Sequence, residues 1–177
     1  MKKKAALIHN NAAGPVPSRN LLARAVRVLE RGPWDVEIYE ATGGHSISDL
    51  ARRALEENMD AIFVAGGDGT VGAAAAVLAG SSTALGVLPA GTANVWAQEL
   101  GLRGLDWIHL YALEEAARRL VNGNIRQVDV GVCNDMSFLM WTGIGLDAQV
   151  VNAMEPRERW EKTFGIAHYA SQALVST

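Results

Sequence analysis

The chain has 177 residues, of which 49% are hydrophobic and 20% are charged, and its formal net charge is −3. This is the composition of an ordinary globular protein, and it lacks the basic excess that a nucleic-acid-binding surface requires. The length allows one domain, or one domain with part of another. Cys133 is the single cysteine, so an intramolecular disulfide is excluded and a reducing, cytoplasmic setting is predicted.

The first hundred residues alternate short apolar runs with longer amphipathic ones. This alternation predicts an α/β fold, in which helices flank an open, mainly parallel sheet. The predicted strands are 5–9, 36–39, 61–65 and 84–88, and the predicted helices are 21–29, 47–55, 73–79, 93–100 and 113–121. Ser46 and Asp49 form a capping-box pattern at the start of the second helix.

The pattern changes near residues 122–124. Valines alternate with other residues from Val128 to Val132, Asn134-Asp135 is typical of a turn, and 138–142 has the composition of a strand. These features predict an antiparallel hairpin. We therefore expect an α/β domain over residues 1–123 and the beginning of an incomplete β-rich domain over residues 124–177.

One uncharged stretch, from Val71 to Ala97, is long enough to span a bilayer. Glycines, serines and a proline interrupt it repeatedly, whereas a spanning helix would be continuously apolar. We predict that it forms buried core, and we expect no transmembrane segment.

The most informative motif follows the third predicted strand, in the sequence Ala61-Ile-Phe-Val-Ala-Gly-Gly-Asp-Gly-Thr70. Glycines at a strand-to-helix turn let the backbone approach a ligand, and the helix N-terminus offers N–H groups with partial positive charge. Phosphate is the ligand that this geometry favours. Gly67 to Gly72 also matches G-x-G-x-x-G, but the acidic residue that would bind a ribose about 20 positions later is missing.

Asp68 is the unusual residue of this turn, because a carboxylate beside phosphate oxygens repels them. Two functional explanations are open: Asp68 contacts a Mg²⁺ ion, or it acts as a general base toward an incoming hydroxyl. The structural explanation is that Asp68 caps the following helix or stabilises a tight turn. For an isolated Gly-Asp-Gly the structural explanation is favoured.

A second turn of this kind follows the next predicted strand, in the sequence Leu88-Pro-Ala-Gly-Thr-Ala-Asn94. Thr92 is placed to cap the following helix and to offer a hydroxyl. Adjacent parallel strands bring both turns to the carboxyl edge of the sheet, where ligands bind in open α/β folds. We therefore predict that the two turns converge on one ligand, which favours a functional role for Asp68.

At these residues the sequence resembles the diacylglycerol kinase catalytic family, which includes bacterial lipid kinases and sphingosine kinases. The family shares with NAD kinase the Gly-Gly-Asp-Gly-Thr turn, here Gly66 to Thr70. NAD kinases lack the Pro-x-Gly-Thr-x-Asn turn that stands here at Pro89 to Asn94, so the lipid-kinase branch is the better match. The resemblance runs from Ala5 to about Val151.

Further points of resemblance are Asn10 to Gly14, Thr42 to His45, Val128 to Gly131 and Gly143 to Ala148. The resemblance implies that ATP contacts Asn10, Thr42, Gly66, Gly67, Asp68, Gly69, Thr70, Val71, Gly72, Gly91, Thr92 and Asn94. It implies that Asp68 is catalytic and a ligand of the metal. Asp147 is expected either to face the lipid head group or to have a structural role in its turn.

The function that the resemblance implies is transfer of the γ-phosphoryl group of ATP to the hydroxyl of diacylglycerol or a related lipid, with Mg²⁺ as cofactor. Such an enzyme reaches its lipid peripherally at a membrane surface. Nucleic acid is not an expected partner, and a homodimer is a candidate assembly. Two alternatives stay open: an NAD kinase-like enzyme that uses the same Asp68 turn, and a non-catalytic nucleotide-binding fragment.

The sequence departs from the family's usual pattern at three points. Asn11 stands where proline is usual, Gly72-Ala73 stands where Asn-Glu is frequent, and Val95 replaces a frequent aspartate. Members of the family have roughly two domains' length, about twice that of this chain. The resemblance therefore implies that carboxylates of the later second domain lie outside this sequence, and we expect a truncated chain.

Overall fold

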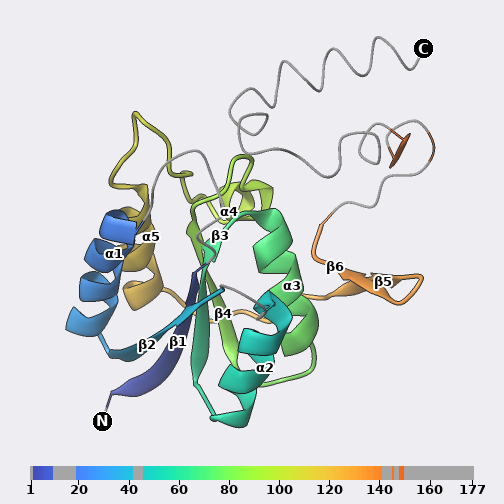
Figure 1. The fold of residues 1–177 in the computed structure, drawn as a ribbon, viewed down its shortest axis with the longest axis horizontal. Coiled ribbons are helices and arrows are strands. Elements are labelled where there is room, and N and C mark those ends of the chain that lie inside the picture. The colour runs from blue at the N-terminus through green and yellow to red at the C-terminus, as the bar shows by residue number, and fades with distance from the viewer. Residues whose placement is uncertain (1, 10–18, 42–45, 141–144, 146–147, 150–177) are drawn as a thin grey trace.

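The computed structural model describes residues 2–9, 19–41, 46–140, 145 and 148–149. Its elements in chain order are β1 (Lys3–His9), α1 (Arg19–Arg31), β2 (Trp34–Glu40), α2 (Ile47–Glu56), β3 (Ala61–Gly66), α3 (Asp68–Leu78), β4 (Ala84–Pro89), α4 (Val95–Glu99), α5 (Ala112–Asn122), β5 (Gly131–Cys133) and β6 (Met136–Phe138) (Figure 1). The alternation of strands and helices expected from the sequence is present.

The first four strands form one parallel sheet in the order β2-β1-β3-β4. All six residues of β3 are buried, as are the last five of β1, which is the burial expected of parallel strands covered on both faces. Helices α1 and α5 pack together on one face, and α2 and α3 pack on the other (Figure 1). The predicted α/β class is confirmed.

The capping box at the start of α2 is also confirmed. The Ser46 hydroxyl accepts the Asp49 N–H at 3.1 Å, and the Asp49 carboxylate accepts the Ser46 N–H at 3.1 Å. Two N–H groups that a helix start leaves unpaired are thus satisfied, which fixes where α2 begins.

The uncharged stretch of residues 71–97 is divided among α3, β4 and α4. None of the helices in the described part of the chain is long and apolar enough to cross a bilayer. The prediction that α3 begins near residue 73 was wrong, because it begins at Asp68. The N–H groups of Thr70 and Val71 donate to the Gly67 carbonyl at 2.9 and 3.0 Å, so the helix forms despite the low helical propensity of its glycines.

Strands β5 and β6 form the predicted antiparallel hairpin as a separate two-stranded sheet. Asn134 and Asp135 both have positive φ angles, 47° and 63°, as a type I′ turn requires. The first strand is shorter than predicted, since β5 begins at Gly131 rather than at Val128. The predicted position of the second strand, 138–142, was wrong, because β6 ends at Phe138, where that strand was expected to begin, and residues 141–142 lie outside the described residues. The hairpin contacts α3, and the domain boundary near residue 123 stays a prediction.

Candidate functional site

The two glycine turns meet at the carboxyl edge of the sheet. Strands β3 and β4 are hydrogen-bonded neighbours in a register that pairs Gly66 with Pro89. The Gly66 carbonyl accepts the N–H groups of Ala90 and Gly91, at 3.1 and 3.2 Å. The predicted convergence of the turns is therefore what the structure shows.

Three glycines in these turns are required by packing inside the protein. A Cβ on Gly91 would overlap the Cα of Gly67 and lie 2.9 Å from its backbone nitrogen. A Cβ on Gly66 would lie 2.6 Å from the Thr70 hydroxyl oxygen. Gly67 and Gly91 thus allow the two backbones to touch, whereas Gly66 leaves room for the Thr70 side chain.

Gly69 and Gly72 are different, because a Cβ on either would meet no atom within 4 Å. Both lie in α3, where glycine costs about 1 kcal/mol relative to alanine. They stand three residues apart, and so on one side of the helix near its N-terminus. This bare surface, beside N–H groups that have no intrahelical partner, leaves room for an anionic group to approach the backbone.

Asp68 connects the two turns. It is the first residue of α3 and half-buried, and its Oδ1 accepts the N–H of Trp96 at 3.0 Å. Trp96 is the second residue of α4, whose own N-cap residue, Asn94, makes no side-chain capping bond. Asp68 therefore caps α4 rather than α3. One accepted hydrogen bond leaves a carboxylate with further capacity, since its two oxygens offer about four acceptor positions.

Asn94 holds the second turn closed. It is 4% exposed and has left-handed backbone angles, with φ 52° and ψ 43°. Its Oδ1 accepts the Gly91 N–H at 2.9 Å, and its Nδ2 donates to the Gly91 carbonyl at 2.8 Å. The Gly91 N–H is thus already engaged within the turn, and the contacts of Gly91 and Asn94 with ATP stay predictions.

The prediction that Thr92 caps the following helix was wrong, because α4 begins at Val95 with Asn94 as its N-cap residue. The residue before the helix is therefore Asn94, in the left-handed conformation, two residues after the expected Thr92. The acceptor that caps the helix is the Asp68 carboxylate. Thr92 is exposed beside the turn.

A hollow of about 620 Å³ opens next to Thr92. Its other polar side chains belong to Asn94, Gln98, Arg103, Asp106 and His109. The Asp106 carboxylate lies 2.9 Å from His109 Nδ1, and this contact, with two backbone N–H bonds, holds the pKa of Asp106 below its usual range. None of residues 66–72 lines the hollow, so it does not include the bare side of α3.

The remaining predicted site residues divide into two groups. Thr70 and Val71 are buried and their N–H groups both donate to the Gly67 carbonyl, and their contacts with ATP stay predictions. Asn10, Thr42 and Asp147 lie outside the described residues, and their roles stay predictions.

The sequence did not predict the hydrogen bonds and close contacts by which distant residues hold the two turns in place. Trp96 stands 28 residues after Asp68, so no local pattern signals their hydrogen bond. Likewise, the Leu105 N–H donates to the Pro89 carbonyl at 2.9 Å, and a Cβ on Gly104 would lie 2.7 Å from Asn94 Nδ2. Gly104 was an available signal, because a glycine shortly after the turn indicates close approach.

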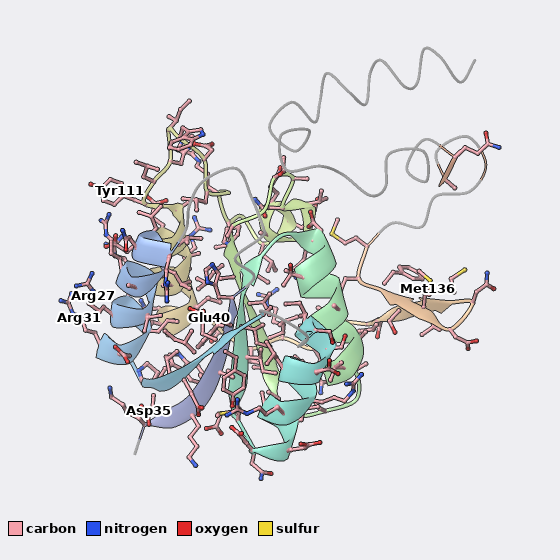
Figure 2. All side chains as sticks on the ribbon, viewed as in Figure 1. Arg27, Arg31, Asp35, Glu40, Tyr111 and Met136 are labelled. Atoms are coloured by element: carbon pink, nitrogen blue, oxygen red, sulfur yellow. The ribbon has the colours of Figure 1, made fainter. Side chains whose placement is uncertain are left out.

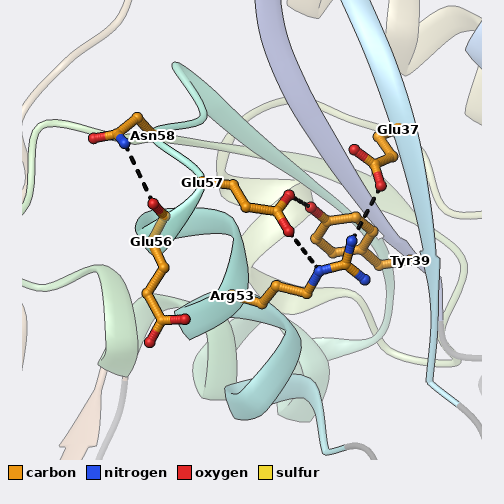
Figure 3. A network of polar contacts seen from close by, with 6 residues as sticks. All are labelled: Glu37, Tyr39, Arg53, Glu56, Glu57 and Asn58. Carbon is orange, nitrogen blue, oxygen red and sulfur yellow. Dashed lines mark hydrogen bonds and ion pairs between the residues drawn. The ribbon is translucent and has the colours of Figure 1, made fainter.

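A second hollow, of about 530 Å³, lies at the amino ends of β1 and β2. Glu37 and Glu57 line it, and both bind the Arg53 guanidinium, at 3.2 and 2.7 Å (Figure 3). The Tyr39 hydroxyl donates to Glu57, which together with Arg53 lowers the pKa of that carboxyl. These groups satisfy one another, and ligands in such folds bind at the opposite edge of the sheet, so we assign no site here.

Comparison with known proteins agrees with this geometry. Residues 4–133 match the family model described as "Diacylglycerol kinase catalytic domain". The chain is 30% identical over 145 residues to a diacylglycerol kinase of Bacillus subtilis, a match that covers 81% of this chain and 46% of the relative. It is 36% identical over 141 residues to a diacylglycerol kinase of Mycobacterium tuberculosis (strain H37Rv), covering 76% of this chain and 42% of the relative.

A solved structure gives the same result. The crystal structure of a diacylglycerol kinase from Bacillus anthracis str. Sterne superposes with a TM-score of 0.64 at 28% identity, covering 77% of this chain and 46% of that one. The chain thus spans less than half the length of these relatives. Because the family model covers most of its residues, this chain belongs to the diacylglycerol kinase catalytic domain family.

Proposed function

We propose that this chain forms the nucleotide-binding part of a lipid kinase, which transfers the γ-phosphoryl group of ATP to the hydroxyl of diacylglycerol or a related lipid. The observation that carries the proposal is the bare side of α3 at Gly69 and Gly72, beside the junction of the two turns. The family and the names of the relatives support a kinase acting on lipid.

In this proposal the phosphates of ATP lie against the N-terminus of α3. The helix start favours negative charge, and Gly69 and Gly72 keep side chains out of the way. Asn10 and Thr42 would complete the nucleotide site from the loops that follow β1 and β2. Asp147 would face the lipid head group from the second domain.

Asp68 stands where the two turns meet, held by its bond to Trp96. Among the described residues no group of three or more His, Cys, Asp or Glu side chains could hold a metal. Mg²⁺ in kinases needs only one or two carboxylates, with phosphates and water supplying the other ligands, so Asp68 fits that role. The bound ion would neutralise charge on the phosphates.

The transfer step makes one bond and breaks one. The lipid hydroxyl oxygen bonds to the γ-phosphorus, the bond from that phosphorus to the bridging oxygen breaks, and ADP leaves with the electron pair. The hydroxyl proton passes to a base, which is the second role open to Asp68.

Calorimetric titration of this chain with Mg²⁺-ATP tests the proposal. We expect binding that Gly72→Leu weakens by at least about tenfold, since the added side chain occupies the space reserved for phosphate. Ala76→Leu is the matched control, because Ala76 is exposed on the same helix one turn later. Absence of binding, or equal binding by both variants, contradicts the nucleotide site.

A transfer assay then identifies the acceptor. With diacylglycerol as acceptor, label from γ-labelled ATP should appear in the phosphorylated lipid that is extracted. Label in NAD instead would favour an NAD kinase-like enzyme, and binding without any transfer would leave a nucleotide-binding unit that is inactive alone.

A further inference from the structure

The loop between α4 and α5 exposes a cluster of large apolar side chains. Trp107 is 66% exposed, Ile108 86%, Leu110 38% and Tyr111 59%. Single exposed apolar residues are common in proteins, but four within five positions make a contiguous patch of the kind that marks an interaction surface. Neither the proposed nucleotide site nor the transfer step uses these residues.

Hydrogen bonds and ring contacts hold this loop in place. Asp106 Oδ1 accepts the N–H groups of Ile108 and His109, both at 2.7 Å. The Arg24 guanidinium lies over the Tyr111 ring, 4.5 Å from its centre. These contacts fix the loop while its apolar side chains stay exposed. The loop should therefore lose little further conformational entropy when it binds a partner.

The loop stands at the same edge of the molecule as the glycine turns. The Leu105 N–H donates to the Pro89 carbonyl, at the end of β4, and so ties the start of the loop to the second turn. A surface that the loop touches therefore lies near the edge where the phosphoryl group would be transferred.

The helix beside the loop is basic. Helix α1 carries four arginines, Arg19, Arg24, Arg27 and Arg31, and one acidic residue, Glu30, in a chain whose net charge is −3. It packs against α5, and Figure 2 shows Arg27 and Arg31 on the same side of the molecule as Tyr111. Arg19 and Arg24 pair with Glu40 and Glu114, whereas Arg27 and Arg31 are exposed.

We infer that Trp107–Tyr111 and the arginines of α1, together the membrane tip, seat the protein on an anionic lipid bilayer. Trp and Tyr prefer the boundary between head groups and acyl chains, and arginines attract anionic head groups. The choice of a bilayer as partner rests on the proposed function, because a lipid acceptor resides in one.

The second domain is a less suitable occupant of this surface. The hairpin β5–β6, where that domain is predicted to begin, contacts α3, on the opposite face of the sheet from α1 and α5 (Figure 1). The other rival is a second copy of the chain, which the experiment below distinguishes.

Sedimentation of this chain with vesicles tests the membrane tip. The vesicles contain phosphatidylcholine and phosphatidylglycerol in equal amounts. The double variant Trp107→Ala, Ile108→Ala should bind with a partition coefficient lower by roughly tenfold for each side chain. Met136→Ala is the matched control, since Met136 is 74% exposed in β6, whose hairpin contacts α3 on the other face of the sheet, and this variant should bind as the unaltered chain does.

Two further sets of variants separate the apolar contribution to vesicle binding from the electrostatic one. Trp107→Phe should keep the binding while abolishing the vesicle-induced blue shift that Trp107 contributes to the fluorescence of the five tryptophans. Replacing Arg27 and Arg31 by Gln should weaken binding to the anionic vesicles several-fold, as expected for about 1 kcal/mol per basic residue, and leave binding to pure phosphatidylcholine unchanged. Arg52→Gln, on α2, is the charge control.

Failure of the inference is distinguishable from failure of the proposed function. Binding of Mg²⁺-ATP without vesicle binding, or equal vesicle binding by the double variant and the Met136 control, overturns the membrane tip alone. A homodimer in sedimentation velocity that the double variant dissociates, with no vesicle binding, also overturns it and assigns the loop to a second copy. Vesicle binding that the double variant loses supports the membrane tip even if Mg²⁺-ATP does not bind.

Discussion

Asp68 has a structural role as a helix cap, and this role can be tested separately from its proposed role in catalysis. Its Oδ1 caps α4 through the Trp96 N–H, and an asparagine at this position keeps an oxygen acceptor while losing the charge. Asp68→Asn should therefore unfold in urea within about 0.5 kcal/mol of the unaltered chain. Asp68→Ala should lose about 1 kcal/mol, the usual value of a helix cap.

Both variants should lose the contribution of Mg²⁺ to ATP binding, and in a chain that carries the second domain both should lose phosphoryl transfer. The comparison of titrations with and without Mg²⁺ checks this. A near-normal Mg²⁺ effect in Asp68→Asn would refute the proposed role of the carboxylate.

Gly91 and Gly69 should respond in opposite ways to the same substitution. Gly91→Ala forces a methyl group into the Gly67 backbone, which cannot move aside as a flexible side chain would, so we expect a loss of about 1–3 kcal/mol in unfolding free energy. Gly69→Ala places its methyl group in open space and should leave stability unchanged or slightly higher. Urea denaturation of the pair measures both; equal losses would show that the close contact between the turns is misplaced.

At the residue scale the sequence identified the right turns without separating the reasons for their glycines. The sequence does not distinguish a glycine that avoids a clash with protein, such as Gly91, from a glycine that lies beside open space, such as Gly72. Only the positions of the neighbouring atoms distinguish them. Asn94 was expected to contact ATP, which stays a prediction, and the sequence did not indicate that both polar atoms of its side chain bind Gly91.

At the scale of single elements, the start of α2 makes a prediction about acid. Hydrogen bonds from Ser46, together with Arg52, lower the pKa of Asp49 to about 2 from 3.8. A carboxyl whose pKa is lowered by folding stabilises the fold above its unfolded pKa, and this contribution is lost as the pH falls through the folded value.

Ser46→Ala should therefore lower the unfolding free energy by about 1 kcal/mol at neutral pH. The difference from the unaltered chain should shrink as the pH falls from about 4 to about 2, where Asp49 becomes protonated. It should not vanish, because the bond from the Asp49 N–H to the Ser46 hydroxyl does not depend on pH. Urea unfolding over that pH range checks the prediction, and a difference that stays constant would contradict it.

Elements defined by their own periodicity were predicted well, and those defined by distant partners were not. The four strands of the main sheet and the helices α1, α2 and α5 lie where the apolar spacing places them. Helix α4 begins later than predicted because its capping oxygen comes from Asp68 on another element. A local sequence pattern cannot indicate a contact between residues that are far apart in the chain.

At the scale of the whole molecule, alternation of strands and helices predicted the α/β class but not the strand order. In the order β2-β1-β3-β4, successive connections leave β1 and β3 in opposite directions, and in open α/β folds ligands bind at the carboxyl ends of strands related in this way. The prediction needed only that β3 and β4 be neighbours, since that alone brings the two turns together.

Both turns are proposed to form one phosphate site at the carboxyl edge of the sheet. Amide ¹H–¹⁵N spectra of this chain, recorded during titration with Mg²⁺-ATP, test it most directly. The largest shifts should occur at Gly67, Gly69 and Gly72, with Gly80 at the far end of α3 unmoved. Shifts centred instead on Lys4, Val36 and Met59, around the hollow at the opposite edge, or no shifts at all, would contradict the account.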